Sequence, residues 1–334
     1  MGKNIINIAL FGLGRIGQMH AENLSNHPEF NLKYIFDLDE NLTKKLSKKY
    51  QCIAIKDPNI AFKDKNIKSI FIATSTNTHL KFIEEAVKNK KIVFCEKPLD
   101  LDLKKIDQCK KNIAKYNPKI QIGFNRRYDP SHYSIKKDLD KNKIGKLEKI
   151  IITSRDPAPP STAYLKSSGG IFRDMMIHDF DLCRLYLEKD EISEVHALAS
   201  SFEKFYKKIK DHELAVVTMK SKKGVICVIT NSRHCAFGYD QRIELFGKKG
   251  MLISGNKVIN STELFNSSRS SSKKPFLNFF VDRYKDAYNL QLKELVALHK
   301  GEIKSRSTFE DGYIALKLAN ACCKSLKLKK TVKL

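Results

Sequence analysis

The chain has 334 residues, of which 42% are hydrophobic and 30% are charged, and 62 basic against 37 acidic residues give a formal net charge of +25. This composition is that of an ordinary globular protein, which excludes a wholly disordered or collagen-like chain. The length exceeds what one hydrophobic core usually serves, so we expect two domains. No apolar run approaches the roughly 18 residues of a transmembrane helix, so we expect no membrane contact.

The first 123 residues alternate between strand patterns and helix patterns. The strand segments are short, nearly continuous apolar runs, which are typical of strands buried on both faces of a parallel sheet. This alternation predicts an α/β fold with a doubly wound parallel sheet, and we assign residues 1–123 to that domain. The predicted strands are Ile5–Phe11, Leu32–Phe36, Ser69–Ala73, Ile92–Cys95 and Ile120–Gly123, and the predicted helices are Arg15–Leu24, Asn41–Tyr50, Thr78–Lys90 and Leu103–Tyr116.

Residues 124–334 show longer strand patterns joined by short turns. They predict a second, α+β domain built on a large, mostly antiparallel open sheet. The Ser- and Lys-rich segment Asn266–Pro275 has no periodicity and is predicted to be a loop. The predicted strands are Glu194–Ser201, Leu214–Met219, Val225–Asn231, Arg242–Phe246 and Met251–Ser254, and the predicted helices are Ser131–Lys141, Ile171–Tyr186, Phe280–His299 and Thr308–Leu326.

A glycine motif, Gly12-Leu13-Gly14-Arg15-Ile16-Gly17, follows the first predicted strand and opens the first predicted helix. The first glycine permits a tight turn, the second lets a pyrophosphate approach the backbone, and the third allows close helix–strand packing. Asp37 ends the next strand, where a carboxylate accepts hydrogen bonds from the ribose hydroxyls and repels a 2′-phosphate. The spacing therefore predicts a dinucleotide site that prefers NAD over NADP. The alternative is a packing turn and a solvated aspartate.

Two further groups of residues carry acid–base chemistry. Glu96-Lys97-Pro98 follows a predicted strand, and ligands of parallel sheets bind at the carboxyl ends of the strands. Asp174 and His178 are four residues apart, which places them on one face of a helix, and a carboxylate beside a histidine favours a general base. The alternatives are a capping aspartate and a buried structural histidine. We expect no metal site, because no third ligand accompanies His178 at a sensible spacing.

Together these motifs resemble the glucose–fructose oxidoreductase/inositol dehydrogenase/rhizopine catabolism family. The resemblance rests on the glycine motif, Thr74–His79, Glu96-Lys97-Pro98 and Gly169–Asp181, and it spans nearly the whole chain. It implies that Lys97, Asp174 and His178 are the catalytic set. It also implies two groups of binding residues. The cofactor-binding residues are Gly12, Gly14, Arg15, Ile16, Gly17, Asp37, Thr74, Ser75, Asn77, His79, Glu96 and Lys97, and the residues that contact the substrate hydroxyls are Lys97, Arg127, Asp156, Asp174, His178 and Tyr239.

The resemblance implies an NAD-dependent dehydrogenase that oxidises a secondary hydroxyl of a cyclic polyol. Gly123–Asp129, Thr153–Pro160 and Tyr239–Gly250 are similar to stretches in bacterial inositol dehydrogenases, which favours the axial C2 hydroxyl of myo-inositol. Family members differ at Arg155-Asp156, so the preferred stereoisomer stays open. The alternatives are scyllo-inositol or an aldose as substrate, a redox-neutral use of NAD, and a non-catalytic NAD-binding sensor. For Arg127 the alternative is a structural salt bridge, and for Tyr239 it is packing of the ring against neighbouring strands.

The family sheet commonly packs against another subunit, so the resemblance implies a homo-oligomer, expected to be a tetramer. The basic residues are spread along the chain without an aromatic-interleaved stripe or a known motif, so we expect no nucleic-acid partner. The eight cysteines form no C-x-x-C pair, and a reducing cytoplasm is the simplest compartment for them.

Overall fold

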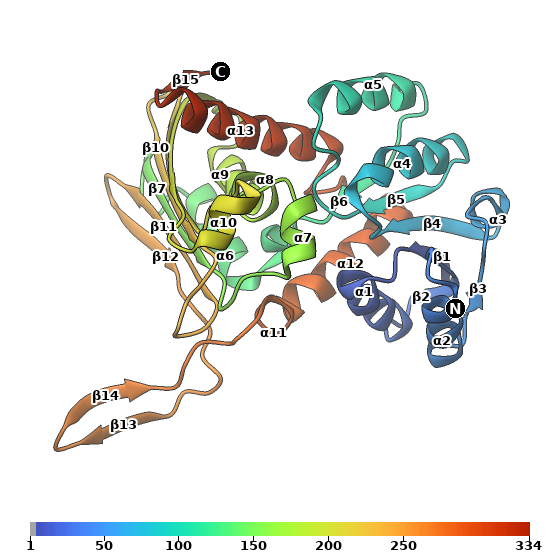
Figure 1. The fold of residues 1–334 in the computed structure, drawn as a ribbon, viewed down its shortest axis with the longest axis horizontal. Helices are drawn as coiled ribbons and strands as arrows, with labels where there is room; N and C mark the ends of the chain where they lie inside the picture. The colour runs from blue at the N-terminus through green and yellow to red at the C-terminus, as the bar shows by residue number, and fades with distance from the viewer. Residues whose placement is uncertain (1–4) are drawn as a thin grey trace. The chain divides into compact units, whose positions relative to one another are not determined.

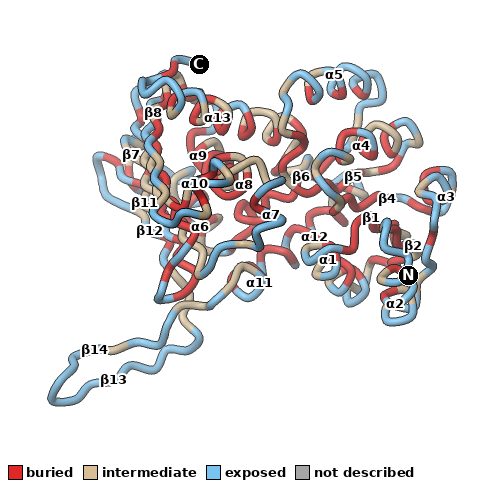
Figure 2. The backbone as a smooth tube through the Cα atoms, viewed as in Figure 1, coloured by how far each residue is buried: buried red, intermediate tan, exposed pale blue. Residues whose placement is uncertain are grey.

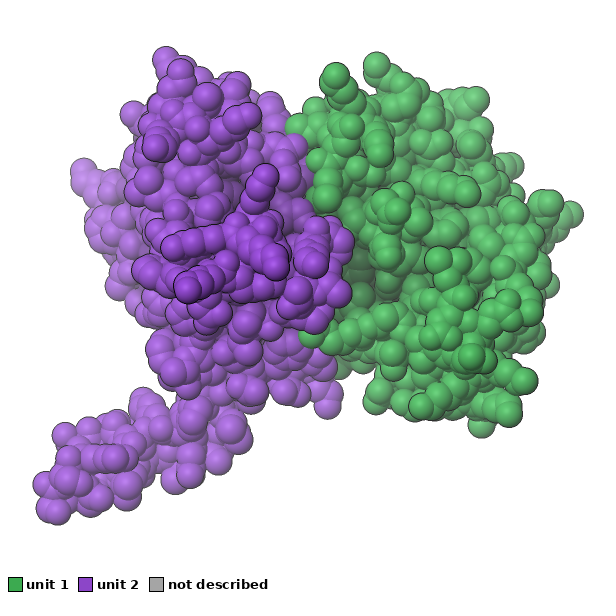
Figure 3. All heavy atoms as spheres, viewed as in Figure 1, with its two compact units in different colours: residues 1–125, 288–314 green, residues 126–287, 315–334 purple. Residues whose placement is uncertain are grey.

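The computed structural model describes residues 5–334, which form two compact units. Of the described residues, unit 1 comprises 5–125 and 288–314, and unit 2 comprises 126–287 and 315–334 (Figure 3). The first boundary lies close to the predicted one at residue 123. The prediction assigns residues 288–314 to the second domain, whereas in the structure they belong to unit 1.

Unit 1 is built on a six-stranded parallel sheet with the strand order β3-β2-β1-β4-β5-β6 (Figure 1). The strands are β1 (Ile6–Phe11), β2 (Phe30–Phe36), β3 (Ile53–Ala54), β4 (Ile67–Ile72), β5 (Ile92–Cys95) and β6 (Ile120–Ile122). The helices between them are α1 (Arg15–Ser25), α2 (Glu40–Tyr50), α3 (Asn59–Lys63), η1 (Thr76–Thr78), α4 (His79–Lys88) and α5 (Leu103–Ala114). The sheet reverses its order between β1 and β4, so the loops that follow these two strands diverge at one edge. This is the place where doubly wound sheets bind ligands.

The core of unit 1 explains why residues 288–314 belong to it. Leu292, Leu295, Val296 and Leu298 lie in helix α12 (Lys285–Lys300) and join the buried cluster formed by β1, β2 and α1. Each buried aliphatic side chain of this kind contributes about 1.5–3 kcal/mol. The sequence of α12 does not reveal that it packs on unit 1. An amphipathic pattern shows that one face of a helix is buried, but it does not show which element covers that face.

Unit 2 contains a seven-stranded sheet with the order β12-β11-β7-β10-β9-β8-β15. All neighbouring pairs are antiparallel except β7 and β10, which are parallel. The strands are β7 (Leu147–Arg155), β8 (Ile192–Ser200), β9 (Leu214–Ser221), β10 (Ile226–Ser232), β11 (Asp240–Gly247), β12 (Gly250–Ser254) and β15 (Val332–Lys333). The remaining elements that begin after β6 are η2 (Asn125–Tyr128), α6 (Pro130–Asp140), α7 (Thr162–Ser167), α8 (Ile171–Asp174), α9 (Ile177–Leu187), α10 (Lys204–Ile209), α11 (Phe280–Arg283) and α13 (Phe309–Leu328), of which α13 runs from unit 1 into unit 2. The predicted fold class is confirmed.

One face of the sheet in unit 2 carries helices, and the opposite face is open. Helix α9 packs on β7 and helix α6 packs on β12. Along strands β9, β10 and β11, buried residues alternate with exposed or half-buried ones, and the strands therefore have mixed colours in Figure 2. The exposed apolar side chains of this face are Leu198, Ile226, Phe246, Met251 and Ile253.

Three features of the chain after residue 124 differ from the sequence predictions. The sequence does not predict strand β7, which lies in the interior of the sheet between β11 and β10, because Leu147–Arg155 mixes charged and apolar residues. The predicted loop Asn266–Pro275 contains part of the hairpin β13 (Glu263–Asn266) and β14 (Arg269–Lys273), which projects from the body of unit 2 (Figure 1). Helix α11 and helix α12 replace one predicted helix. Within residues 5–334, no helix is long and apolar enough to cross a membrane.

Candidate active site

The glycine motif forms the turn between β1 and α1. Gly12 has φ +90°, and a Cβ atom added there would lie 2.4 Å from the carbonyl carbon of Ala73. A Cβ atom on Gly17 would lie 2.0 Å from the carbonyl oxygen of Gly12, so this position also requires glycine. Gly14 differs, because a Cβ atom there would meet no protein atom within 4 Å. The first and third glycines therefore serve packing, and the second leaves open space at the N-terminus of α1, as a bound pyrophosphate requires.

Asp37 follows β2 and turns its carboxylate toward the glycine turn. The amide of Leu13 donates a hydrogen bond of 2.6 Å to Oδ2, and the amide of Asp39 donates one of 3.0 Å to Oδ1. Each carboxylate oxygen keeps acceptor capacity for a ribose hydroxyl. Asp37 is thus fixed beside the turn rather than free in solvent, and these residues fit a dinucleotide.

The loop after β4 is tied to the turn after β5 by His79. Its Nδ1 lies 2.8 Å from the carbonyl oxygen of Pro98, and its Nε2 lies 3.0 Å from that of Thr74. Burial lowers the pKa of His79, although the two carbonyl oxygens act to raise it. Ser75 and Asn77 lie on the exposed side of this loop. The histidine predicted to flank the cofactor therefore bridges two loops through its ring, and cofactor contact by this loop stays a prediction.

Glu96 supports the backbone beside Lys97. His20 Nε2 lies 2.7 Å from Glu96 Oε1, and the amide of Lys97 donates to Oε2 at 3.3 Å. A Cβ atom on Gly123 would lie 2.7 Å from Glu96 Oε2, so the carboxylate fills the space that this glycine leaves. Lys97 itself is half-buried at the carboxyl end of the sheet. The sequence did not single out His20, because one histidine in an amphipathic helix carries no distinctive signal.

Asp174 and His178 lie on two separate helices, whereas the sequence predicts one helix over Ile171–Tyr186. Asp174 ends α8 and His178 belongs to the first turn of α9. The amide of Met176 bonds to the carbonyl of Ile171, five residues earlier, and this wider turn breaks the helix between them. The four-residue spacing therefore does not by itself place the two side chains on one helical face.

Asp174 is held by two side chains that the sequence did not single out. The Tyr164 hydroxyl donates a hydrogen bond of 2.6 Å to Oδ1, and Arg233 Nη1 lies 3.4 Å from Oδ2. Tyr164 lies in α7, and Arg233 follows β10. Only the tertiary fold brings these distant segments to the aspartate.

Of the side chains predicted to contact substrate hydroxyls, all but Lys97 lie in unit 2. Arg127 is buried, and its Nε and Nη2 donate hydrogen bonds of 2.7 and 2.6 Å to the two oxygens of Asp181. The salt bridge that the sequence left open for Arg127 is therefore present. Tyr239 is buried with its hydroxyl 3.5 Å from Arg126 Nη2, and burial raises the pKa of its phenol. Substrate contact by these residues stays a prediction.

Asp156 is half-buried just beyond β7. Its amide donates a hydrogen bond of 2.9 Å to the carbonyl of Ser232, which continues the pairing of β7 with β10. Lys97 and the residues of the glycine turn belong to unit 1, whereas Asp156, Asp174 and His178 belong to unit 2. The predicted convergence of Lys97 and His178 on one carbon atom stays a prediction.

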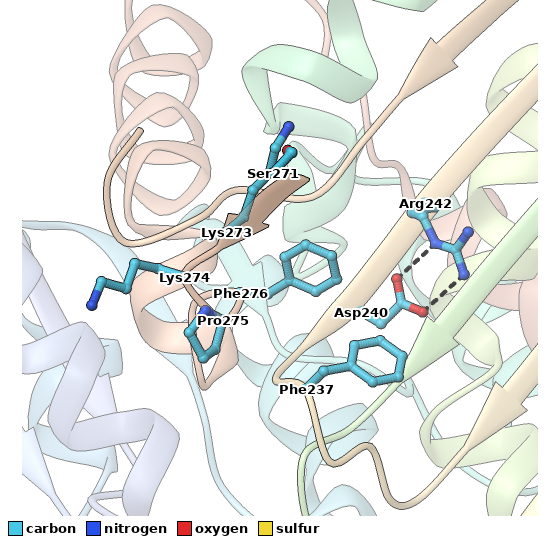
Figure 4. Close-up of a pocket in the computed structure, with 8 residues that line it drawn as sticks. All are labelled: Phe237, Asp240, Arg242, Ser271, Lys273, Lys274, Pro275 and Phe276. Carbon is cyan, nitrogen blue, oxygen red and sulfur yellow. Dashed lines mark hydrogen bonds and ion pairs between the residues drawn. The ribbon is translucent and has the colours of Figure 1, made fainter. Parts of the chain in front are cut away.

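Unit 2 also has an open pocket at the base of the β13–β14 hairpin. Figure 4 shows the rings of Phe237 and Phe276 in this pocket and the Arg242 guanidinium on the carboxylate of Asp240. None of the predicted site residues lines it. The lining residues are Phe237, Asp240, Arg242, Ser271, Lys273, Lys274, Pro275 and Phe276.

Comparisons with known proteins agree with this geometry. Residues 6–124 match the family described as "Oxidoreductase family, NAD-binding Rossmann fold", and residues 132–253 match the "GFO/IDH/MocA C-terminal domain". The chain is also 40% identical over 331 residues to "Myo-inositol 2-dehydrogenase" of Thermotoga maritima, an alignment that covers 98% of both chains. The chain belongs to the GFO/IDH/MocA family. Its cofactor is NAD, as the sequence predicts.

Solved structures of GFO/IDH/MocA relatives share the whole fold. A myo-inositol dehydrogenase from Corynebacterium glutamicum superposes with a TM-score of 0.94 at 39% identity and covers 99% of both chains. A scyllo-inositol dehydrogenase from Lactobacillus casei, solved with bound NAD(H) and scyllo-inositol, has a TM-score of 0.91 at 28% identity and covers 98% of this chain and 99% of its own. The predicted family, fold class and oxidoreductase class are therefore confirmed.

Proposed function

We propose that the protein oxidises a secondary hydroxyl of a cyclic polyol, with myo-inositol as the substrate and 2-keto-myo-inositol as the product. The observation that carries this proposal is the 40% identity over 98% of both chains to a myo-inositol 2-dehydrogenase. Lys97, Asp174 and His178, which match the catalytic set of the family, are all present. A non-catalytic sensor has no need of this full set.

In the proposed reaction, His178 removes the proton of the substrate hydroxyl as the carbon–hydrogen bond breaks. Lys97 donates a hydrogen bond to the same oxygen and stabilises the negative charge that develops there. Asp174 orients His178 and favours its protonated form after the transfer. NAD supplies the nicotinamide carbon that accepts the hydride. The products are a ketone, NADH and one proton, so atoms and electrons balance.

The stereoisomer is decided by a substrate panel. Purified protein is mixed with NAD and with myo-inositol, scyllo-inositol or D-glucose, and NADH absorbance is followed. We expect the highest kcat/KM with myo-inositol. A higher value with scyllo-inositol would favour the activity of the Lactobacillus casei relative, and no NADH with any of them would refute the dehydrogenase proposal.

We also propose that the protein is a homotetramer of the cytoplasm. The open face of the sheet in unit 2 exposes Leu198, Phe246, Met251 and Ile253 by 40 to 61%, and an exposed apolar face of this kind marks an interface. All eight cysteines are free thiols, which suits a reducing compartment. Light scattering on the purified protein tests the assembly. A monomer at working concentration would contradict it.

A further inference from the structure

Asp174 is held from two sides in unit 2. Its side chain is only 9% exposed, and each of its two oxygens has a different partner in unit 2. Oδ1 accepts the Tyr164 hydroxyl at 2.6 Å, and Oδ2 faces Arg233 Nη1 at 3.4 Å. A carboxylate held at both oxygens by groups from different segments has one orientation.

The guanidinium of Arg233 is itself fixed by a second carboxylate. Arg233 is buried, and its Nη2 lies 3.2 Å from Asp211 Oδ2. The other oxygen of Asp211 accepts the amide of Ile171 at 2.8 Å, which is the first residue of α8, the helix that Asp174 ends. Arg233 therefore joins both ends of this one-turn helix to the segment that follows β10.

Tyr164 differs from the other members of this group in its exposure. It lies in α7, is 43% exposed, and donates its hydroxyl hydrogen bond to Asp174. Removal of its hydroxyl deletes the hydrogen bond to Asp174 without opening a cavity in the core. The Tyr164 phenol and the Arg233 guanidinium thus both face Asp174 from neighbouring elements, with Asp211 behind the guanidinium.

We propose that Tyr164 is a positioning residue for the dehydrogenase reaction, acting through Asp174 together with Arg233. This inference rests on the proposed function. The phenol fixes the direction of the carboxylate and withdraws part of its negative charge by donating a hydrogen bond. Without it, the carboxylate rotates more freely and orients His178 less well in the proposed reaction.

The test is Tyr164→Phe, which removes only the donor. We expect kcat with myo-inositol to fall about tenfold, which corresponds to about 1.4 kcal/mol of barrier. The acid limb of the kcat/KM profile should move to higher pH, because a carboxylate that has lost a hydrogen-bond donor binds a proton more readily. The affinity for NAD and the melting temperature should stay within error of the wild-type values.

The matched control is Tyr186→Phe. Tyr186 is a buried tyrosine of the same unit, and its hydroxyl donates to the backbone carbonyl of His132 at 3.2 Å. This variant should lower the melting temperature and leave kcat and the pH profile unchanged. If Tyr164→Phe also changes only the melting temperature, the positioning role is overturned.

A second variant tests the other contact of Asp174, the one with Arg233. Arg233→Lys keeps the positive charge but cannot reach Asp174 and Asp211 with two nitrogens at once. A fall in kcat with a displaced acid limb would support the inference, and wild-type values would overturn it. A wild-type protein that reduces no NAD with any cyclitol would overturn the proposed function. An active wild type with an unchanged Tyr164→Phe variant would overturn only the positioning role.

Discussion

The buried ion pair between Arg126 and Asp179 offers a sharp test of the energetics of unit 2. Asp179 has no exposed surface, and its carboxylate accepts Arg126 Nη1 at 2.5 Å, Ser154 Oγ at 2.7 Å and Asn231 Nδ2 at 2.8 Å. Burial raises the pKa of Asp179, and the Arg126 guanidinium opposes that rise. The perturbation is Asp179→Asn, which keeps the size of the side chain and removes its charge.

The expected cost follows from what the change leaves behind. The Arg126 guanidinium stays buried without its counter-charge, and removing one partner of such a pair costs about 3–5 kcal/mol. The new amide also has to point its own NH₂ group at a donor, either Arg126 or Asn231, which adds a donor–donor contact. We therefore expect Asp179→Asn to lower the free energy of unfolding by about 3–5 kcal/mol.

The assay is urea unfolding followed by far-ultraviolet circular dichroism, since the chain contains no tryptophan. Glu191→Gln is the control, because the Glu191–Lys222 pair has the same 2.5 Å separation as Arg126–Asp179 but lies on the surface, and its loss should leave the unfolding midpoint unchanged. The double change Arg126→Met with Asp179→Leu should recover much of the loss, because no buried charge remains. A cost below about 1 kcal/mol for Asp179→Asn would refute the reasoning.

Three further outcomes are expected. Gly14→Ala should weaken NAD binding about tenfold or more without changing the melting temperature. Gly17→Ala should lower both the affinity for NAD and the melting temperature. Calorimetry measures the affinity, and thermal unfolding measures the melting temperature. Asp37→Asn should raise the ratio of NADP to NAD activity about tenfold, because a like charge about 4 Å away costs about 1 kcal/mol in water and a phosphate carries about two. Burial lowers the pKa of His299 to about 4, so the unfolded chain binds a proton first as the pH falls below about 6.5. The wild type therefore loses about 2 kcal/mol of its free energy of unfolding between pH 7 and pH 5 through this histidine. In urea titrations, the His299→Leu variant should lack this part of the loss.

The sequence alone determined the parts of this protein that depend on local chain geometry. The order of the elements in unit 1 follows from apolar runs and helical periods that read the same in any context. The glycine motif is local in the same way, since Gly12 has φ +90° and a Cβ atom on Gly17 would meet the carbonyl oxygen of Gly12, five residues earlier. Asp37 was found for the same reason, because its distance from the turn is fixed by one helix and one strand.

Only the tertiary structure decided which distant groups meet. The pairing of β7 with β10, the attachment of residues 288–314 to unit 1, and the contacts of Asp174 with Tyr164 and Arg233 join segments far apart in the chain. The break between α8 and α9 also depends on segments far apart in the chain, because the side chains that fix the end of α8 come from α7 and from the segment after β10. Periodicity records which face of an element is buried, but the free energy that selects its partner comes from packing and buried charge pairs, which no single segment contains.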